Sequence, residues 1–101
     1  MNIGFALKLI RIKMAITQGE LAKKSNFTQT SISQIETGKK KPTKRTLAKL
    51  CSALEIPESI VYIIGMEEMD MPESKKNIFH IIYPSMQELA LQLVEQGHTI
   101  K

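Results

Sequence analysis

Two polar helix-start signals in residues 17–28 constrain the fold of this chain more than any other feature. Thr17 and Glu20 have the spacing of a capping box, in which each side chain accepts a hydrogen bond from the other residue's backbone amide. Thr28 can cap a second helix with its hydroxyl. Between these signals, Asn26 tolerates the left-handed conformation that ends the first helix. After the second helix, Gly38 is typical of the position that follows a helix end. The pattern predicts two short consecutive helices separated by a turn of roughly four residues.

Apolar residues at helical spacing predict three further helices in residues 1–65. One precedes the two capped segments, one follows Thr43, and one begins at Pro57 and ends at Gly65. Strand signals are weak, because there is no sustained alternation and no Asn-Gly or Asp-Gly hairpin turn. We therefore expect an all-α, five-helix domain over residues 1–65. The residues predicted to face its core are Ile3, Ala6, Leu7, Ile10, Leu21, Ala22, Ile32, Ile35, Leu47, Leu50, Cys51 and Leu54.

Residues 66–101 have a different character. Residues 66–71 are acidic and rich in methionine, which predicts a linker. Pro84 separates two helical patterns and is expected to stop the first, so that residues 72–101 form a helical hairpin. Because 72–96 carries more apolar surface than one small bundle needs, we expect it to mediate homodimerisation or pairing with another protein. Alternatively, the hairpin folds back and only thickens the core.

The charge is divided unevenly along the chain. Residues 1–65 hold eleven Lys and Arg against four Glu, a balance of +7, whereas residues 66–101 hold three Lys against six acids, a balance of −3. This asymmetry favours a polyanion as the partner of the first part. A basic surface that serves only solubility is the alternative, and motifs must decide between them.

The motifs of residues 15–43 resemble those of a known protein family. Three blocks follow in order: Thr-Gln-Gly-Glu-Leu-Ala, then Ser-Ile-Ser-Gln-Ile-Glu-Thr-Gly, then Lys-Pro. They resemble the helix-turn-helix proteins of the phage-repressor family, which includes lambdoid repressor, Cro and the xenobiotic-response-element regulators. The resemblance covers about residues 3–65 and implies a lambda-repressor-like fold that binds double-stranded DNA. Two departures are Asn26, where the family usually has Gly, and Gly19, where a stronger helix former is common.

The helix over residues 28–37 presents a face suited to reading bases. With Ile32 and Ile35 turned inward, its outer face carries short hydroxyls and long amides and no large apolar residue. An amide both donates and accepts, so Gln can pair with adenine, while Thr offers a methyl to thymine. The alternative is an ordinary polar helix face. The resemblance implies that Gln29, Thr30 and Gln34 touch base edges, with Thr28 and Ser33 contributing less.

The resemblance also implies which residues hold the DNA backbone and which join the helices. Thr17 and Gln18 open the second helix, where free amides and the positive dipole end favour an anion. Arg11 and Glu36 match a family ion pair between the first and third helices. The residues that match the family's other backbone contacts are Thr37, Lys39, Lys40, Lys41 and Lys44.

Other kinds of chemistry find little support in the sequence. His80 and His98 lie in separate segments without carboxylates or thiols at metal-ligand spacing, so we expect no metal, no cofactor and no enzyme activity. Cys51 lies on an apolar stripe, which predicts a buried core residue. The longest apolar run, Ile60–Ile64, is far shorter than the ~20 residues that span a bilayer, so we expect a cytoplasmic protein without a membrane partner.

The sequence therefore predicts a sequence-specific DNA-binding transcription regulator, a dimeric repressor that occupies a double-stranded operator. One alternative is the antitoxin of a toxin–antitoxin pair, whose C-terminal hairpin holds a toxin as protein partner. Another is a protein–protein adaptor that keeps the helix-turn-helix fold without binding DNA. Steep weakening of binding with added salt would distinguish DNA binding from the adaptor.

Overall fold

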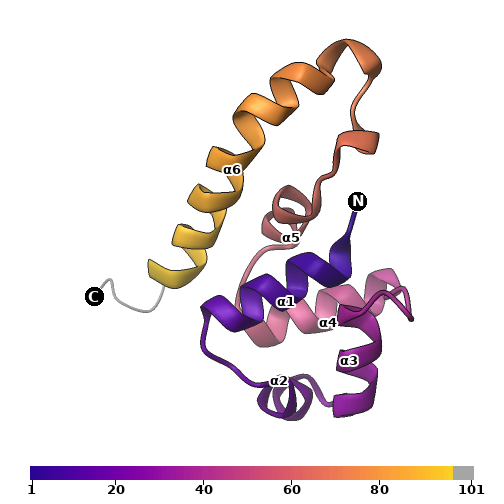
Figure 1. The fold of residues 1–101 in the computed structure, drawn as a ribbon. Coiled ribbons are helices and arrows are strands. Elements are labelled where there is room, and N and C mark those ends of the chain that lie inside the picture. The colour runs from indigo at the N-terminus through magenta and orange to yellow at the C-terminus, as the bar shows by residue number, and fades with distance from the viewer. Residues whose placement is uncertain (97–101) are drawn as a thin grey trace.

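The computed structural model describes residues 1–96, and every regular element in that range is helical (Figure 1). The first five helices form a bundle, and the sixth runs along its side. The all-α, lambda-repressor-like fold expected for residues 1–65 is confirmed. In chain order the elements are α1 (Ile3–Lys13), α2 (Gln18–Ser25), α3 (Gln29–Glu36), α4 (Lys44–Leu54), α5 (Glu58–Gly65), the 3-10 turns η1 (Glu68–Asp70) and η2 (Glu73–Lys75), and α6 (Lys76–Gln96).

The helix boundaries follow from local hydrogen bonds. The Thr17 hydroxyl accepts from the Glu20 amide at 3.0 Å, and the Glu20 carboxylate accepts from the Thr17 amide at 2.8 Å, which completes the capping box of α2. Thr28 and Thr43 cap α3 and α4 through the amides three residues later. Asn26 ends α2 with a φ of 64°, in the left-handed conformation expected of it.

Buried aliphatic side chains from α1 to α5 form one core, to which α6 adds Ala90 and Val94. Eleven of the twelve residues predicted to face the core are buried. The twelfth, Ile3, is half-buried and packs against the core. Cys51 is among the buried residues, as predicted. Burial in this apolar surrounding raises the pKa of its thiol to about 11, with a smaller contribution from the negative charge of Glu58.

The helical hairpin expected over residues 72–101 is wrong, because α6 continues through Pro84 as one helix (Figure 1). Proline removes one helical hydrogen bond, but its φ suits a helix and the rest of the helix can persist when packing holds both sides. Here Phe79 is buried before the proline, and Ala90 and Val94 are buried after it. The Tyr83 hydroxyl also donates to the backbone carbonyl of Ile64 in α5. His98, named above, lies outside the described residues.

The segment expected to be a linker, residues 66–71, contains η1 and is tied to the start of the chain. The amine of Met1 forms ion pairs with Glu67 at 2.7 Å and with Asp70 at 2.8 Å. The amine donates hydrogen bonds to Asp70 and to Glu67, and these bonds, the one to Asp70 first, raise its pKa. From η1 the chain passes through η2 into α6, whose first half projects beyond the five-helix bundle (Figure 1). This projection agrees with a radius of gyration of 14.0 Å, above the ~13 Å of a compact domain of 100 residues.

Among residues 1–96, none of the helices combines the length and the apolar character that crossing a bilayer requires.

Candidate nucleic-acid interface

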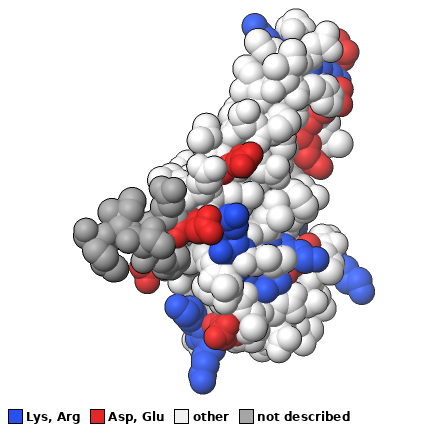
Figure 2. Space-filling view, turned by 60° about the vertical axis from the view of Figure 1, so that its left-hand side comes forward, with Lys and Arg blue, Asp and Glu red and all other residues white. Residues whose placement is uncertain are grey.

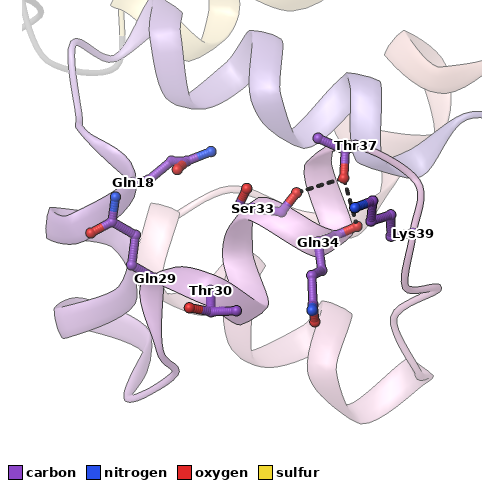
Figure 3. Close-up of a pocket in the computed structure, with 7 residues that line it drawn as sticks. All are labelled: Gln18, Gln29, Thr30, Ser33, Gln34, Thr37 and Lys39. Atoms are coloured by element: carbon purple, nitrogen blue, oxygen red, sulfur yellow. Dashed lines mark hydrogen bonds between the residues drawn. The ribbon is translucent and has the colours of Figure 1, made fainter.

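Helix α3 is held by its two isoleucines and turns its polar side chains outward. Ile32 and Ile35 are buried in the core, whereas Gln29, Thr30 and Gln34 are exposed. The close-up shows Thr30 and Gln34 on the open side of α3, whereas the Gln29 amide turns toward Gln18 at the start of α2 (Figure 3). The face contains hydrogen-bond donors and acceptors in reach of a ligand that lies along α3.

A shallow open hollow of about 470 Å³ runs along this face (Figure 3). It is formed by the start of α2, the outer side of α3 and the loop after α3. Every lining residue is one that the sequence predicted to contact DNA. These residues are Gln18, Gln29, Thr30, Ser33, Gln34, Thr37 and Lys39.

The other predicted contact residues surround this hollow without lining it. Thr17 and Thr28 are exposed at the starts of α2 and α3, where their hydroxyls serve as caps. Lys40 and Lys41 line a neighbouring cavity of about 230 Å³ between the loop and the start of α1. Lys44 is exposed at the first turn of α4.

The start of α2 is only partly available to an anion. The Thr17 amide already donates to Glu20, and this hydrogen bond, followed by the one from the Thr17 hydroxyl, lowers the pKa of Glu20. The amides of Gln18 and Gly19 remain in the first turn, where the helix dipole favours negative charge. An anion would therefore meet these two amides beside the Glu20 carboxylate.

A buried polar network fixes α3 relative to α1 and α2. The Arg11 guanidinium donates to both carboxylate oxygens of Glu36, at 2.7 and 3.0 Å, and also to the Ile16 carbonyl at 2.8 Å. The Gln18 side-chain amide donates to the same carboxylate at 3.0 Å. Both charged side chains are nearly inaccessible to solvent. A paired and hydrogen-bonded buried charge holds its partners in one geometry, so this network sets the position of the outward face.

The sequence reasoning missed two features of the site. The sequence predicts a phosphate contact for Gln18, and in the structure its side-chain amide also donates to Glu36, which links the start of α2 to the end of α3. The second feature is Gly4, at which α1 passes close to the end of α3. A glycine inside an otherwise regular helix was the available signal, because such a position costs helix stability unless a close approach requires it.

The histidine of the described part lies away from this surface. His80 is exposed on α6, and its Nε2 lies 3.0 Å from a carboxylate oxygen of Glu68. Within residues 1–96, no group of three or more His, Cys, Asp or Glu residues could hold a metal ion.

The fold and this surface define a helix-turn-helix domain, in which α2 supports α3 and α3 faces outward. A family model described as "Helix-turn-helix" matches residues 7–61, and the chain belongs to this family, of the phage-repressor and xenobiotic-response-element type. Among curated proteins, it is similar to "Transcriptional regulator ClgR" from two strains of Mycobacterium tuberculosis, CDC 1551 / Oshkosh and ATCC 25618 / H37Rv.

Each of these two matches is 31% identical over 71 residues, which is 70% of this chain. The aligned region spans 63% of the length of those curated relatives. No solved structure gave a significant match.

Proposed function

We propose that this chain is a DNA-binding transcription regulator that places α3 in the major groove of a specific double-stranded operator. Membership of the helix-turn-helix family and the similarity to a transcriptional regulator support DNA-binding transcription regulation. The observation that carries the finer proposal is the exposed row of Gln29, Thr30 and Gln34 along α3. Only a groove wide enough to admit a helix brings base edges to such a row.

The outward side chains have the chemistry of direct base reading. Gln29 and Gln34 carry amides that can donate and accept together, which suits the N6 and N7 edge of adenine. The methyl of Thr30 suits the C5-methyl of thymine, with Thr28 and Ser33 as further contacts. These residues determine the preferred sequence.

The surrounding groups hold the phosphates and fix the register. The amides at the start of α2 receive one phosphate together with Thr17 and Gln18. Lysines in the loop after α3 and at the start of α4 receive others without sequence information. The proposed backbone contacts are Thr17, Gln18, Thr37, Lys39, Lys40, Lys41 and Lys44.

One helix-turn-helix covers a single half-site, so we propose that two copies act together as a repressor. Two domains related by a twofold axis place their recognition helices ~34 Å apart, one turn of the duplex. The dimer forms through residues 72–96, and the bound dimer excludes polymerase or another factor from the operator. A segment that adds apolar surface outside the five-helix core supports this arrangement.

Selection of bound duplexes from a random pool tests the proposed function. We expect enrichment of an inverted repeat, with binding that weakens by a log–log salt slope of roughly −0.9 per phosphate neutralised. No enrichment, together with partner binding that is insensitive to salt, would favour a protein–protein adaptor instead.

An antitoxin is a second candidate, and the exposed apolar side of α6 is the observation that favours it. In that case α6 holds a small toxin while α3 binds DNA. Co-purification of a small protein encoded beside this chain would support the antitoxin.

A further inference from the structure

Helix α6 has two apolar faces, of which the bundle uses only one. The inner face buries Phe79, Ala90 and Val94 against α1, α5 and the turns before α6. The outer face leaves five aliphatic side chains exposed, from 44% for Ile82 to 76% for Ile81. We call this set the outer face of α6: Ile78, Ile81, Ile82, Leu89 and Leu93.

These side chains form one stripe along the helix. Ile78, Ile82, Leu89 and Leu93 fall within about 60° of each other at 100° per residue, and Ile81 flanks them. No Lys, Arg, Asp or Glu interrupts the stripe between Ile78 and Leu93, although Glu88 lies at its edge. Figure 2, turned toward this side of the molecule, shows a largely uncharged surface along α6. Monomeric proteins seldom leave such a long apolar surface open to water.

The spacing of the stripe is symmetric about its own middle. Ile82 and Leu89 lie equally far from the midpoint between Ser85 and Met86, and so do Ile78 and Leu93. When two copies of a helix pair antiparallel about that midpoint, Ile78 of one copy opposes Leu93 of the other, and Ile82 opposes Leu89. In both of these layers an apolar side chain meets an apolar side chain, as in a surface complementary to itself, while Ile81 stays at the edge of the contact.

We propose that the outer face of α6 pairs antiparallel with the same face of a second copy of this chain, with the twofold axis passing between Ser85 and Met86. This inference rests on the dimer of the proposed function and assigns its interface and register. A second copy is the occupant because a twofold contact requires the same residues on both sides. Symmetric apolar spacing is not required of a surface that binds an unrelated partner.

The pairing also agrees with the shape of the chain. The first half of α6 projects beyond the five-helix bundle (Figure 1), so in the antiparallel pair it lies beside the second half of the partner helix. The serine at the centre of the stripe is small, which allows the two helices to approach closely. A twofold axis here relates the two α3 helices and therefore matches an inverted repeat in the DNA.

Sedimentation of the full chain with and without a charge on this face is the first test. We expect the natural chain to sediment as a dimer and Leu89→Glu to sediment as a monomer. Because Leu89 is 64% exposed, the variant keeps the fold, which circular dichroism verifies. The matched control is Tyr62→Glu, which places the same charge on an exposed side chain of α5 and should leave the dimer intact.

Cysteine cross-linking tests the register. Ile82→Cys and Leu89→Cys, co-expressed with different tags, should form a disulfide between unlike chains on oxidation. Each variant alone should not, because its two cysteines lie seven positions, ~10 Å, apart along the paired helices. The natural Cys51 is buried and should not react, so the unsubstituted chain is the blank.

The outcomes separate this inference from the proposed function. A natural chain that is monomeric, a Leu89→Glu variant that stays dimeric, or self-linking of Ile82→Cys alone would overturn the antiparallel pairing. Binding of Leu89→Glu to a duplex half-site is measured in parallel. If Leu89→Glu binds the half-site more weakly but still in a salt-dependent way, the DNA-binding role is supported whatever the sedimentation shows. If neither the natural chain nor Leu89→Glu binds the half-site, the DNA-binding role is contradicted.

Discussion

A Cβ on Gly4 of α1 would lie 2.1 Å from the backbone carbonyl oxygen of Ile35 in α3. This distance is far below any van der Waals contact, and the obstructing atom is backbone, which cannot rotate away. The close approach brings α1 against the last turn of the helix proposed to enter DNA. Gly4 therefore sets how deeply α3 sits in the bundle.

Gly4→Ala should destabilise the protein, although alanine is the better helix former. Overpacking of this kind typically costs ~1–3 kcal/mol, and α3 must shift to relieve it. Chemical denaturation measures the free energy of unfolding. Gly19→Ala is the matched control, because its Cβ meets nothing closer than 3.6 Å, and it should stabilise by ~0.5–1 kcal/mol. Equal effects of the two substitutions would refute the packing role of Gly4.

Removing one member of the buried ion pair should cost more stability than removing both. Arg11→Met leaves the Glu36 carboxylate buried with only the Gln18 amide as a side-chain donor, and we expect a loss of ~3–5 kcal/mol. The double variant Arg11→Met/Glu36→Met should recover part of that loss, because no unpaired charge remains. A double-mutant cycle from urea unfolding measures the coupling. Additive losses would mean that the two charges do not depend on each other.

Left-handed residues offer a test of backbone strain. Glu55 ends α4 with a φ of 59°, a conformation that costs a non-glycine residue ~1–2 kcal/mol. Glu55→Gly should therefore stabilise the fold by about 0.5–1 kcal/mol after the entropy of glycine is subtracted. Gly38, at a φ of 83° with open space around it, supplies the opposite case, and Gly38→Ala should destabilise by about 1 kcal/mol. Thermal unfolding measures both effects. If the two substitutions shift the melting temperature in the same direction, backbone strain does not explain them.

Stability should decrease in alkaline solution because of Cys51. Burial raises the pKa of its thiol from 9.0 to about 11, so the folded state holds the proton more tightly than the unfolded state does. The contribution is complete below pH 9 and disappears as the pH rises to 11. It amounts to roughly 2–3 kcal/mol at a conversion of about 1.4 kcal/mol per pH unit.

Denaturant unfolding at several pH values measures this contribution. The difference between the natural chain and Cys51→Ala isolates the contribution of the thiol from that of every other group. A constant difference between pH 8 and pH 11 would show that the thiol is not responsible.

The caps and the core could be predicted from sequence because they depend on short-range patterns. The hydroxyls of Thr17, Thr28 and Thr43 bond amides three residues later, and the apolar stripes follow the helical repeat. The continuation of α6 through Pro84 could not be predicted in this way. It depends on Ala90 and Val94 joining the core formed by α1 to α5, and on the Tyr83 hydroxyl bonding Ile64 of α5.

In the candidate site too, some features could be predicted from spacing and others depend on how the helices pack. The outward face of α3 follows from the inward isoleucines of the same helix, so the exposure of Gln29 and Gln34 could be predicted from spacing, whereas their base-reading role is what the family resemblance implies. The hydrogen bond from Gln18 to Glu36 and the contact of α1 at Gly4 require three helices to be placed in space first. Ala15, with a φ of 58°, carries no sequence signal for its left-handed conformation.

The central claim is that α3 reads bases while the following loop only holds phosphates, and one paired measurement tests it directly. Binding of Gln34→Ala and Lys40→Ala is titrated against the selected operator and a scrambled duplex at one salt concentration. We predict that Gln34→Ala loses ~1–3 kcal/mol on the operator and little on the scrambled duplex, whereas Lys40→Ala weakens both about equally. If the two substitutions weaken both duplexes alike, the division between reading and anchoring is wrong.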